Sequence, residues 1–110
     1  MNYPEGPYKQ LASAMVTQHI RDYYNSAKRM VTLSILYLTG SGGREHAYLC
    51  AEFSDNKWRY LQNKEFLLSP WFEELSDLNG EEIKRKLDVK VSEYGNERLL
   101  RTTNKAVSKN

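Results

Sequence analysis

The spacing of apolar residues predicts two long helices in the first two thirds of the chain. From Tyr8 onward, apolar side chains recur at steps of three to five residues, the pattern of a helix with one buried face. A glycine-rich segment at 40–43 is typical of a helix end and a reversal, and a second, rougher helical stripe follows it. We therefore expect helices over residues 8–38 and 44–68 that pack in antiparallel directions.

Residues 31–38 also allow a different interpretation. Their sequence, VTLSILYL, contains β-branched residues in partial alternation, which is typical of a strand. A β-hairpin within 31–53, pairing 31–38 with 47–53, is therefore the alternative. The helix is favoured because no turn signal separates 31–38 from the helical pattern before it, and because residues 47–53 alternate poorly.

The last part of the chain predicts two short helices. Ser69 is a preferred N-cap and Pro70 suits the first helical position, so a helix should begin there and continue to residue 76. A turn-rich stretch precedes a second helix over 80–91, and Gly95 should prevent any continuation. The expected fold class is therefore mainly α, with two long antiparallel helices and two short C-terminal helices.

Apolar residues of this C-terminal region should meet in one cluster. Trp71 and Phe72 are expected at its centre because large aromatic side chains bury the most surface. The expected members are Phe66, Leu67, Trp71, Phe72, Leu75, Leu78, Ile83 and Leu87. Such a cluster would close the core between the short helices and the long ones.

The composition fits one small domain: 110 residues, of which 40% are hydrophobic and 27% charged. The polar ends, residues 1–7 and 98–110, are expected to be flexible. No apolar run reaches the roughly 18 residues of a membrane span. The single cysteine excludes an internal disulfide and suits a reducing compartment. We therefore expect a cytoplasmic protein with no membrane partner.

The net charge of +2 is small, but the charges are unevenly distributed. Residues 73–82 carry five acids and no bases, whereas residues 83–110 carry eight bases and three acids. The bases that would contact phosphates of a nucleic acid are Lys84, Arg85, Lys90, Arg98, Arg101 and Lys105. A helix-turn-helix motif is disfavoured, because Glu81 and Glu82 would open the recognition helix and repel phosphate. A small DNA-binding accessory or regulatory protein is therefore the alternative function.

Surplus aromatic residues favour a protein partner instead. Eight tyrosines and two tryptophans exceed what a core of this size can fully bury, and exposed aromatic side chains are typical of contact surfaces. The acids of 73–82 would face a basic surface of that partner. The candidate partner-binding residues are Tyr23, Tyr24, Trp58, Tyr60, Glu73, Glu74, Asp77 and Glu81. Pairing of two copies into a homodimer through exposed aromatic residues stays open.

No residue pattern in the sequence predicts an enzyme. His46 and Cys50 share a helical face, but a structural zinc site needs four ligands and no second such pair exists. Residues 77–80 lack the ligating acids of a calcium loop around them, and the glycines of 40–43 lack the lysine of a phosphate loop. We therefore expect no catalytic residue, no metal site and no cofactor, and a protein that acts by binding.

Two segments, 14–29 and 65–87, carry further motifs. In the first, the motif Val-x-Gln-Ala-x-x-Asp-Tyr is matched by Val16, Gln18, Asp22 and Tyr23. In the second, the matching residues are Phe66, Ser69, Trp71, Phe72, Leu75, Ser76, Leu78, Gly80, Lys86 and Leu87. With these residues the chain resembles a family of small, mostly uncharacterised helical proteins carried by phages and integrative elements of Gram-positive bacteria. The matching positions are core and turn types, so the resemblance implies a helical fold more than an activity.

The resemblance also implies a biological setting. The chain departs from the family pattern at His19, Leu67 and Asn79, and its segment 31–63 is longer. Small phage proteins of this size often bind and disable host defence machinery, anti-CRISPR proteins among them. The expected function is therefore a non-enzymatic accessory protein that binds and inhibits a host protein or complex, such as a nuclease effector, in the cytoplasm of the host bacterium.

Overall fold

The computed structural model describes the backbone of residues 5–40 and 45–108 and the side chains of residues 10–40 and 45–101. The backbone forms four α-helices: α1 (Glu5–Thr39), α2 (His46–Leu67), α3 (Pro70–Ser76) and α4 (Gly80–Ser108). No strand occurs in the described residues, so the expectation of a mainly α fold is confirmed.

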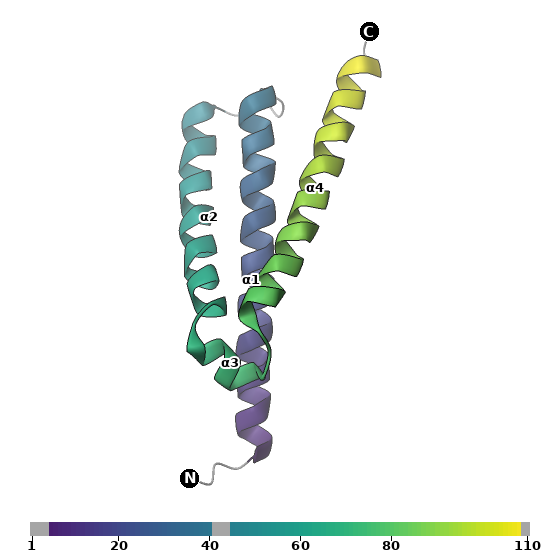
Figure 1. The fold of residues 1–110 in the computed structure, drawn as a ribbon. Coiled ribbons are helices and arrows are strands. Elements are labelled where there is room, and N and C mark those ends of the chain that lie inside the picture. The colour runs from purple at the N-terminus through teal and green to yellow at the C-terminus, as the bar shows by residue number, and fades with distance from the viewer. Residues whose placement is uncertain (1–4, 41–44, 109–110) are drawn as a thin grey trace.

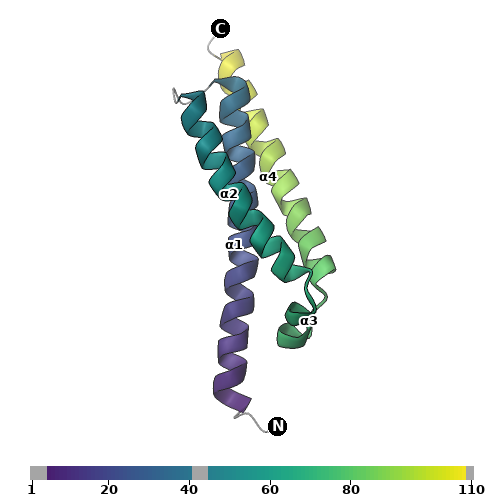
Figure 2. The ribbon, with the colours of Figure 1, turned by 90° about the vertical axis from the view of Figure 1, so that its left-hand side faces the viewer.

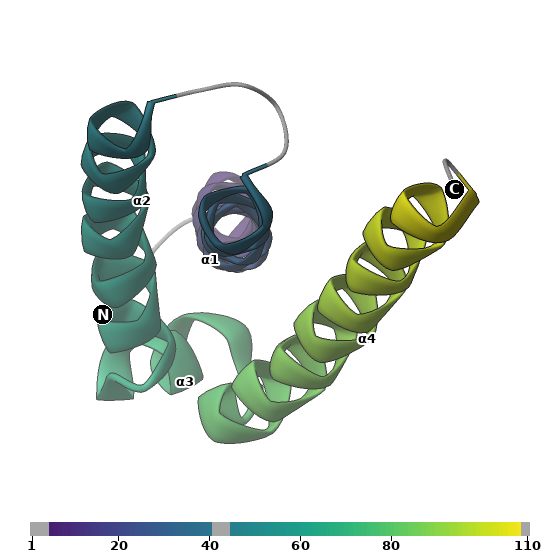
Figure 3. The ribbon, with the colours of Figure 1, turned by 90° about the horizontal axis from the view of Figure 1, so that it is seen from above.

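The long helix α1 forms the centre of the molecule. α2 runs antiparallel to the C-terminal half of α1, and α4 runs along another side of α1 (Figure 1). The short helix α3 follows α2 and leads the chain to α4, and the N-terminal turns of α1 extend beyond it (Figure 2). Toward its C-terminus α4 diverges from α2, as the view along α1 shows (Figure 3). The molecule is therefore elongated, with extents of 67 × 25 × 20 Å.

The segment 31–39 is helical and belongs to α1, so the alternative hairpin does not occur in the described residues. Its hydroxyl groups are used inside the helix; the Thr32 hydroxyl, for example, donates a hydrogen bond to the Lys28 carbonyl at 3.0 Å. Leu33 in the same segment is buried. Packing of α1 against its neighbours therefore outweighs the strand propensity of the β-branched residues.

Both ends of the chain are more helical than the sequence predicts. α1 begins at Glu5 and α4 continues to Ser108, whereas the sequence predicts helices that begin at residue 8 and end at residue 91. The first four and the last two residues lie outside the described residues. Three of the helices in the described residues are therefore long, and the expectation of a short final helix is wrong.

Gly95 lies inside α4 and does not end it. A glycine costs only about 1 kcal/mol in a helix relative to alanine. Contacts with α1 offset this cost: the Tyr94 hydroxyl lies 2.8 Å from the Thr32 hydroxyl, and a Cβ atom at Gly95 would come within 3.1 Å of Val31 Cγ1. Because of this tertiary packing, α4 continues beyond Gly95, where the local sequence predicts a helix end.

The apolar cluster forms with Phe72, and not Trp71, at its centre. Phe72 is fully buried, whereas Trp71 is 63% exposed. Neighbouring residues of a helix point about 100° apart, so one of the two faces solvent when the other faces the core. The buried residues of the cluster are Val16, Tyr23, Leu67 and Phe72, with Ile20, Tyr60, Phe66, Leu75, Ile83 and Leu87 packed against them. Leu78, another expected member, is exposed.

The expected start of α3 at Ser69 and Pro70 is observed, with a different hydrogen bond. Ser69 occupies the N-cap position, but its hydroxyl donates to the Phe66 carbonyl at 2.6 Å and does not accept a hydrogen bond from the new helix. Pro70 fits because the first helical position needs no backbone donor. Ser69 therefore closes the end of α2 as well as opening α3.

A close backbone approach positions the start of α4 against the end of α2. A Cβ atom on Gly80 would lie 1.7 Å from the Leu67 carbonyl oxygen, so glycine is required there. Asp77, with a left-handed backbone (φ 58°), ends α3. The Asn79 side chain caps α4 by accepting a hydrogen bond from the Glu82 backbone N–H at 3.1 Å. These local signals set the direction in which α4 leaves the turn.

Candidate protein-binding surface

A polar contact attaches α4 to the rest of the molecule. The Tyr23 hydroxyl of α1 donates a hydrogen bond to Asp88 Oδ1 of α4 at 2.5 Å, and Lys84 Nζ donates to Asp88 Oδ2 at 2.7 Å. The Tyr60 ring of α2 stacks on the Tyr23 ring with centroids 5.1 Å apart. The Asp88 carboxylate of α4 is thus paired with Lys84 and held beside Tyr23 of α1 and Tyr60 of α2.

This contact raises the pKa of two of its members, Tyr23 and Lys84. Burial, followed by the hydrogen bond to Asp88, raises the pKa of Tyr23 well above its ordinary value of 10.0. The hydrogen bond to the same carboxylate raises the pKa of Lys84 above 10.5. Tyr23 and Lys84 therefore keep their protons near neutral pH, and the contact is an attachment point and not a proton-transfer site.

Beyond this contact α4 diverges from α2 (Figure 3). A hollow lined by α1, α2 and α4 lies there, and we call it, with its extensions, the α2–α4 groove. Its central part has a volume of about 470 Å³. Most of its lining is apolar or aromatic and comes from all three long helices: Met30, Val31, Ile35, Phe53, Tyr60 and Val91. An apolar, concave surface of this kind is suited to receive apolar side chains of a binding partner.

A neighbouring hollow extends the groove toward the C-terminal end of α1. This hollow of about 410 Å³ shares Ser34 and Phe53 with the central part. Tyr37 and Leu38, which are 43% and 81% exposed, form part of its lining. The apolar floor therefore continues along α1 into a region where large apolar side chains are open to solvent.

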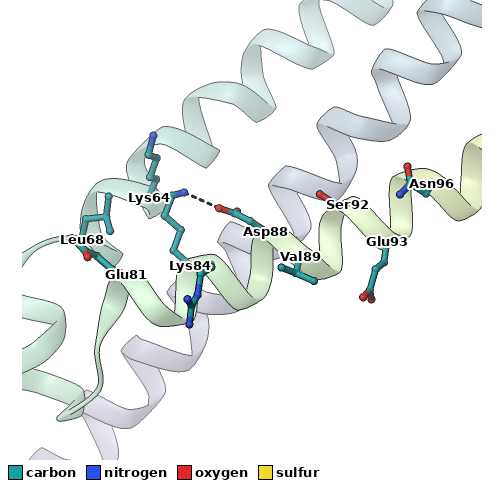
Figure 4. A pocket seen from close by; sticks show the side chains of 10 residues that line it. Lys64, Leu68, Glu81, Lys84, Asp88, Val89, Ser92, Glu93 and Asn96 are labelled. Atoms are coloured by element: carbon teal, nitrogen blue, oxygen red, sulfur yellow. Dashed lines mark hydrogen bonds and ion pairs between the residues drawn. The ribbon is translucent and has the colours of Figure 1, made fainter.

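A second hollow extends the groove toward α3. It has a volume of about 650 Å³ and shares Asp88 and Ser92 with the central part. Figure 4 shows Lys64 and Leu68 of α2 on one side and residues of α4 on the other, with the ion pair between Lys84 and Asp88. Leu68 and Val89 are the apolar residues of this part of the groove, and its other lining residues are charged or polar.

Together the three hollows follow α2 from Leu49 to Leu68. At a rise of 1.5 Å per residue, that distance is about 29 Å, or roughly five helical turns. A groove of this length between two helices, with a third as its floor, has the dimensions of a site for one amphipathic helix. The arrangement therefore supports binding of a helical segment.

The structure distributes the expected partner-binding aromatic residues over different environments. Tyr23 is fully buried, so its assignment to a contact surface is wrong: it is needed in the core. Tyr24 is half-buried, with Lys28 Nζ 4.7 Å from its ring centroid. Tyr60 lines the α2–α4 groove, and Trp58 is 62% exposed on α2. Of the four, Tyr60 alone belongs to the groove.

The expected acidic contact residues are all exposed. Glu73, Glu74 and Asp77 lie on α3 and the turn after it, and Glu81 lies in the first turn of α4. Glu81 also lines the α3 end of the groove. The structure therefore brings this one acid to the groove and leaves the other three on the surface of the α3 region.

The bases expected to contact nucleic acid are interleaved with acids along α4. Lys84 pairs with Asp88, Lys86 with Glu82 at 3.5 Å, and Arg101 with Glu97. Arg85 lines the α3 end of the groove, Lys90 is exposed and Arg98 is half-buried near Tyr94. The side chain of Lys105 lies outside the described residues. The described part of α4 therefore presents mixed charge.

Other faces of α1 and α2 form a polar groove of about 770 Å³. There, Arg29 pairs with Glu52 at 2.8 Å, and His19 Nδ1 lies 2.8 Å from Asn63 Oδ1. The His19 ring also stacks on Phe66 at 4.0 Å. These polar side chains are bound mainly to each other, which is typical of the solvated edge of a helix pair.

His46 and Cys50, the pair weighed above as metal ligands, both lie in the N-terminal part of α2. His46 packs against the Tyr37 ring, with centroids 4.5 Å apart, and Cys50 is exposed and lines the hollow near the C-terminal end of α1. Among the residues that the structure describes, no three His, Cys, Asp or Glu side chains lie close enough together to hold a metal ion. His46 and Cys50 therefore serve as packing and surface residues here.

Sequence reasoning missed the residues that form the groove floor. The sequence pattern predicts one apolar stripe that continues through Ala27 to Met30 or Val31. In the structure Ala27, Met30 and Val31, together with Ile35, line a face that α2 and α4 cover incompletely. A second apolar stripe on one helix is the signal that could have indicated two packing faces. The tilt of α4, which opens the groove, has no such local signal.

Comparison of the chain with models of known protein families, with curated proteins and with solved structures gives no match. Within the described residues, no helix combines the length and the apolar character that crossing a membrane requires. The α2–α4 groove is thus the feature on which a proposal about function can be based.

Proposed function

We propose that this protein acts without catalysis, by binding one amphipathic helix of a protein partner in the α2–α4 groove. The observation that carries the proposal is the apolar floor of α1 between α2 and α4, which no described segment of the chain covers completely. In recognition of this kind, apolar side chains at helical spacing supply the affinity, and the charged rim selects the partner. Tyr60 and Val91 are the groove residues that would contact the bound helix most centrally.

The proposal includes the setting that the family resemblance implies. The protein would act as a phage or mobile-element accessory factor in the host cytoplasm, and the partner would be a host defence protein such as a nuclease effector. Segments 14–29 and 65–87 carry this part of the proposal. Stoichiometric capture of one helix of an effector would inhibit it without any chemical step.

Charges around the groove support a protein partner over nucleic acid. The α3 end is lined by three bases and three acids: Lys64, Lys84, Arg85, Glu81, Asp88 and Glu93. Balanced charge of this kind gives no net attraction for phosphate, whereas apolar burial is nearly independent of salt. Binding in the groove should therefore depend weakly on ionic strength.

A serine in the groove allows a direct test. Ser92 is exposed and lines both the central part and the α3 end of the groove, so Ser92→Arg would place a long charged side chain in the path of a bound helix. We expect the tagged variant to capture at least about tenfold less host protein from lysate than the unmodified chain, because the long side chain would fill space that the bound helix needs.

Ser13→Arg is the matched control, because Ser13 is also an exposed helical serine and lies outside the groove. This variant should capture the same protein in the same amount, before and after nuclease treatment of the lysate. Equal capture by Ser92→Arg and Ser13→Arg would exclude the groove as the binding site. Loss of capture after nuclease treatment would indicate nucleic acid instead.

A further inference from the structure

The side of α2 that faces away from α1 carries a regular stripe of its own, which we call the outer stripe. Its positions alternate in steps of four and three residues: Ala47, Ala51, Ser54, Trp58, Leu61, Glu65 and Leu68. All seven are exposed, Trp58 by 62%, Leu61 by 46% and Leu68 by 44%, and Ser54 and Leu68 also lie at the edge of the α2–α4 groove. Figure 3 shows no other helix on that side of α2. Spacing of this kind is that of a seam between paired helices.

The order of side-chain sizes along the outer stripe specifies its partner. The N-terminal half contains Ala47, Ala51 and Ser54, and the C-terminal half contains Trp58 and Leu61. We infer that two copies of this chain pair through the outer stripe in antiparallel directions, with a two-fold axis near residue 56. Trp58 of each copy then packs over Ser54 of the other, and Leu61 over Ala51.

Only the antiparallel pairing matches large residues with small ones. In a parallel pair, Trp58 would meet Trp58, and Ala51 would meet Ala51, so one end would be overfilled and the other would leave a void. A two-fold interface repeats each contact, so the single Trp58–Ser54 match is made twice. The order of side-chain sizes therefore fits an antiparallel pair and does not fit a parallel pair.

The expected interface is small. Its paired stretch, 47–65, is about 27 Å long, and a helix with its side chains is about 10–12 Å across, so the two faces together cover a footprint of roughly 600 Å². Stable complexes bury about 1,200 Å² or more. We therefore expect a reversible dimer with a dissociation constant in the micromolar range. Asp55 and Lys57 flank the axis, so each would lie near the same residue of the other copy and repel it. Added salt screens this repulsion and should therefore tighten the dimer.

Sedimentation of the full chain from about 1 to 200 µM tests this inference. The unmodified chain should shift from monomer to dimer over this range. Ala51→Glu, which places a carboxylate opposite Leu61 of the other copy, should weaken dimerisation at least about tenfold. Ala14→Glu is the matched control: Ala14 is also an exposed helical alanine, on α1, and this variant should dimerise normally. Circular dichroism establishes that both variants are folded.

The single cysteine reports the direction of pairing. Cys50 is exposed beside the outer stripe, and in the antiparallel dimer the two copies of Cys50 lie 12 residues apart along the axis. Spin labels there should be about 20 Å apart, against about 10 Å in a parallel pair. A chain that stays monomeric at about 200 µM, equal dissociation constants for Ala51→Glu and Ala14→Glu, or a separation near 10 Å would each overturn the inference. Ser92→Arg, which blocks the groove, should leave dimerisation unchanged, so the two proposals fail separately.

Discussion

The Tyr23 hydroxyl links α1 to α4 by its hydrogen bond to the Asp88 carboxylate. Tyr23→Phe removes the hydrogen bond to Asp88 and leaves the ring and its stacking on Tyr60 in place. A hydrogen bond to a charged group contributes about 1.5–3 kcal/mol, so we expect the free energy of unfolding to fall by that amount in urea titrations. Tyr60→Phe is the comparison, because the Tyr60 hydroxyl lies 3.5 Å from that of Tyr23 and makes a weaker contact; its loss should stay below about 1 kcal/mol.

Tyr23 also makes the folding stability depend on pH. The pKa of Tyr23 is raised in the folded state, so above pH 10.0 the unfolded chain releases the proton while the folded chain retains it. Its contribution is therefore fully present below pH 10.0 and is lost as the pH rises further. Thermal melts between pH 8 and pH 11 should show a falling melting temperature, and Tyr23→Phe should show a shallower fall. Equal slopes for the two proteins would contradict the assignment.

At the scale of elements, the junction of α2 and α4 depends on one glycine. A Cβ atom at Gly80 would overlap the Leu67 carbonyl oxygen, which is backbone and cannot rotate away. Gly80→Ala should therefore lower the free energy of unfolding by about 3 kcal/mol, at the upper end for overpacking. Gly95→Ala is the control, because its Cβ would contact only the Val31 side chain at 3.1 Å and helix propensity would improve. Its stability change should stay within about 1 kcal/mol, as chemical denaturation would show.

The predicted helix ends agree with the structure where local signals set them, and they differ where tertiary contacts set them. Pro70 and Asn79 act through their own backbone and side-chain geometry, and the predicted starts of α3 and α4 match the structure within a residue. Gly95 is different, because its local cost is offset by contacts with a helix more than 60 residues away in the chain. Trp71 and Phe72 are equally apolar neighbours, and their different burial follows from the direction in which α3 is docked. Local patterns therefore predicted the elements, whereas the choice of faces depended on tertiary packing.

At the scale of the whole molecule, α1 acts as a shared support for two different surfaces. α2 and α4 pack on separate sides of it and diverge from each other (Figure 3). The α2–α4 groove lies between them, and the outer stripe is a separate row of exposed residues on α2, of which Ser54 and Leu68 also line the groove. Neither surface is evident from the composition, because the residues that form each are ordinary helix residues. The groove follows from the angle between α2 and α4, which single-sequence patterns do not contain. The spacing of the outer stripe is present in the sequence, but its exposure depends on which side of α2 packs against α1.

The C-terminal part of α4 separates the proposed function from its alternative. The groove lining ends at Asn96, so a chain without residues 102–110 should capture its protein partner within about twofold of the full chain. It should also do so at both 50 and 200 mM salt, since apolar burial is nearly independent of ionic strength. A nucleic-acid complex would behave otherwise: Lys105 and Lys109 would be lost, and a protein with six to ten phosphate contacts loses about 10³–10⁵ in affinity over that salt range. Capture that falls steeply with salt, and falls again on truncation, would assign function to the basic tail instead of the groove.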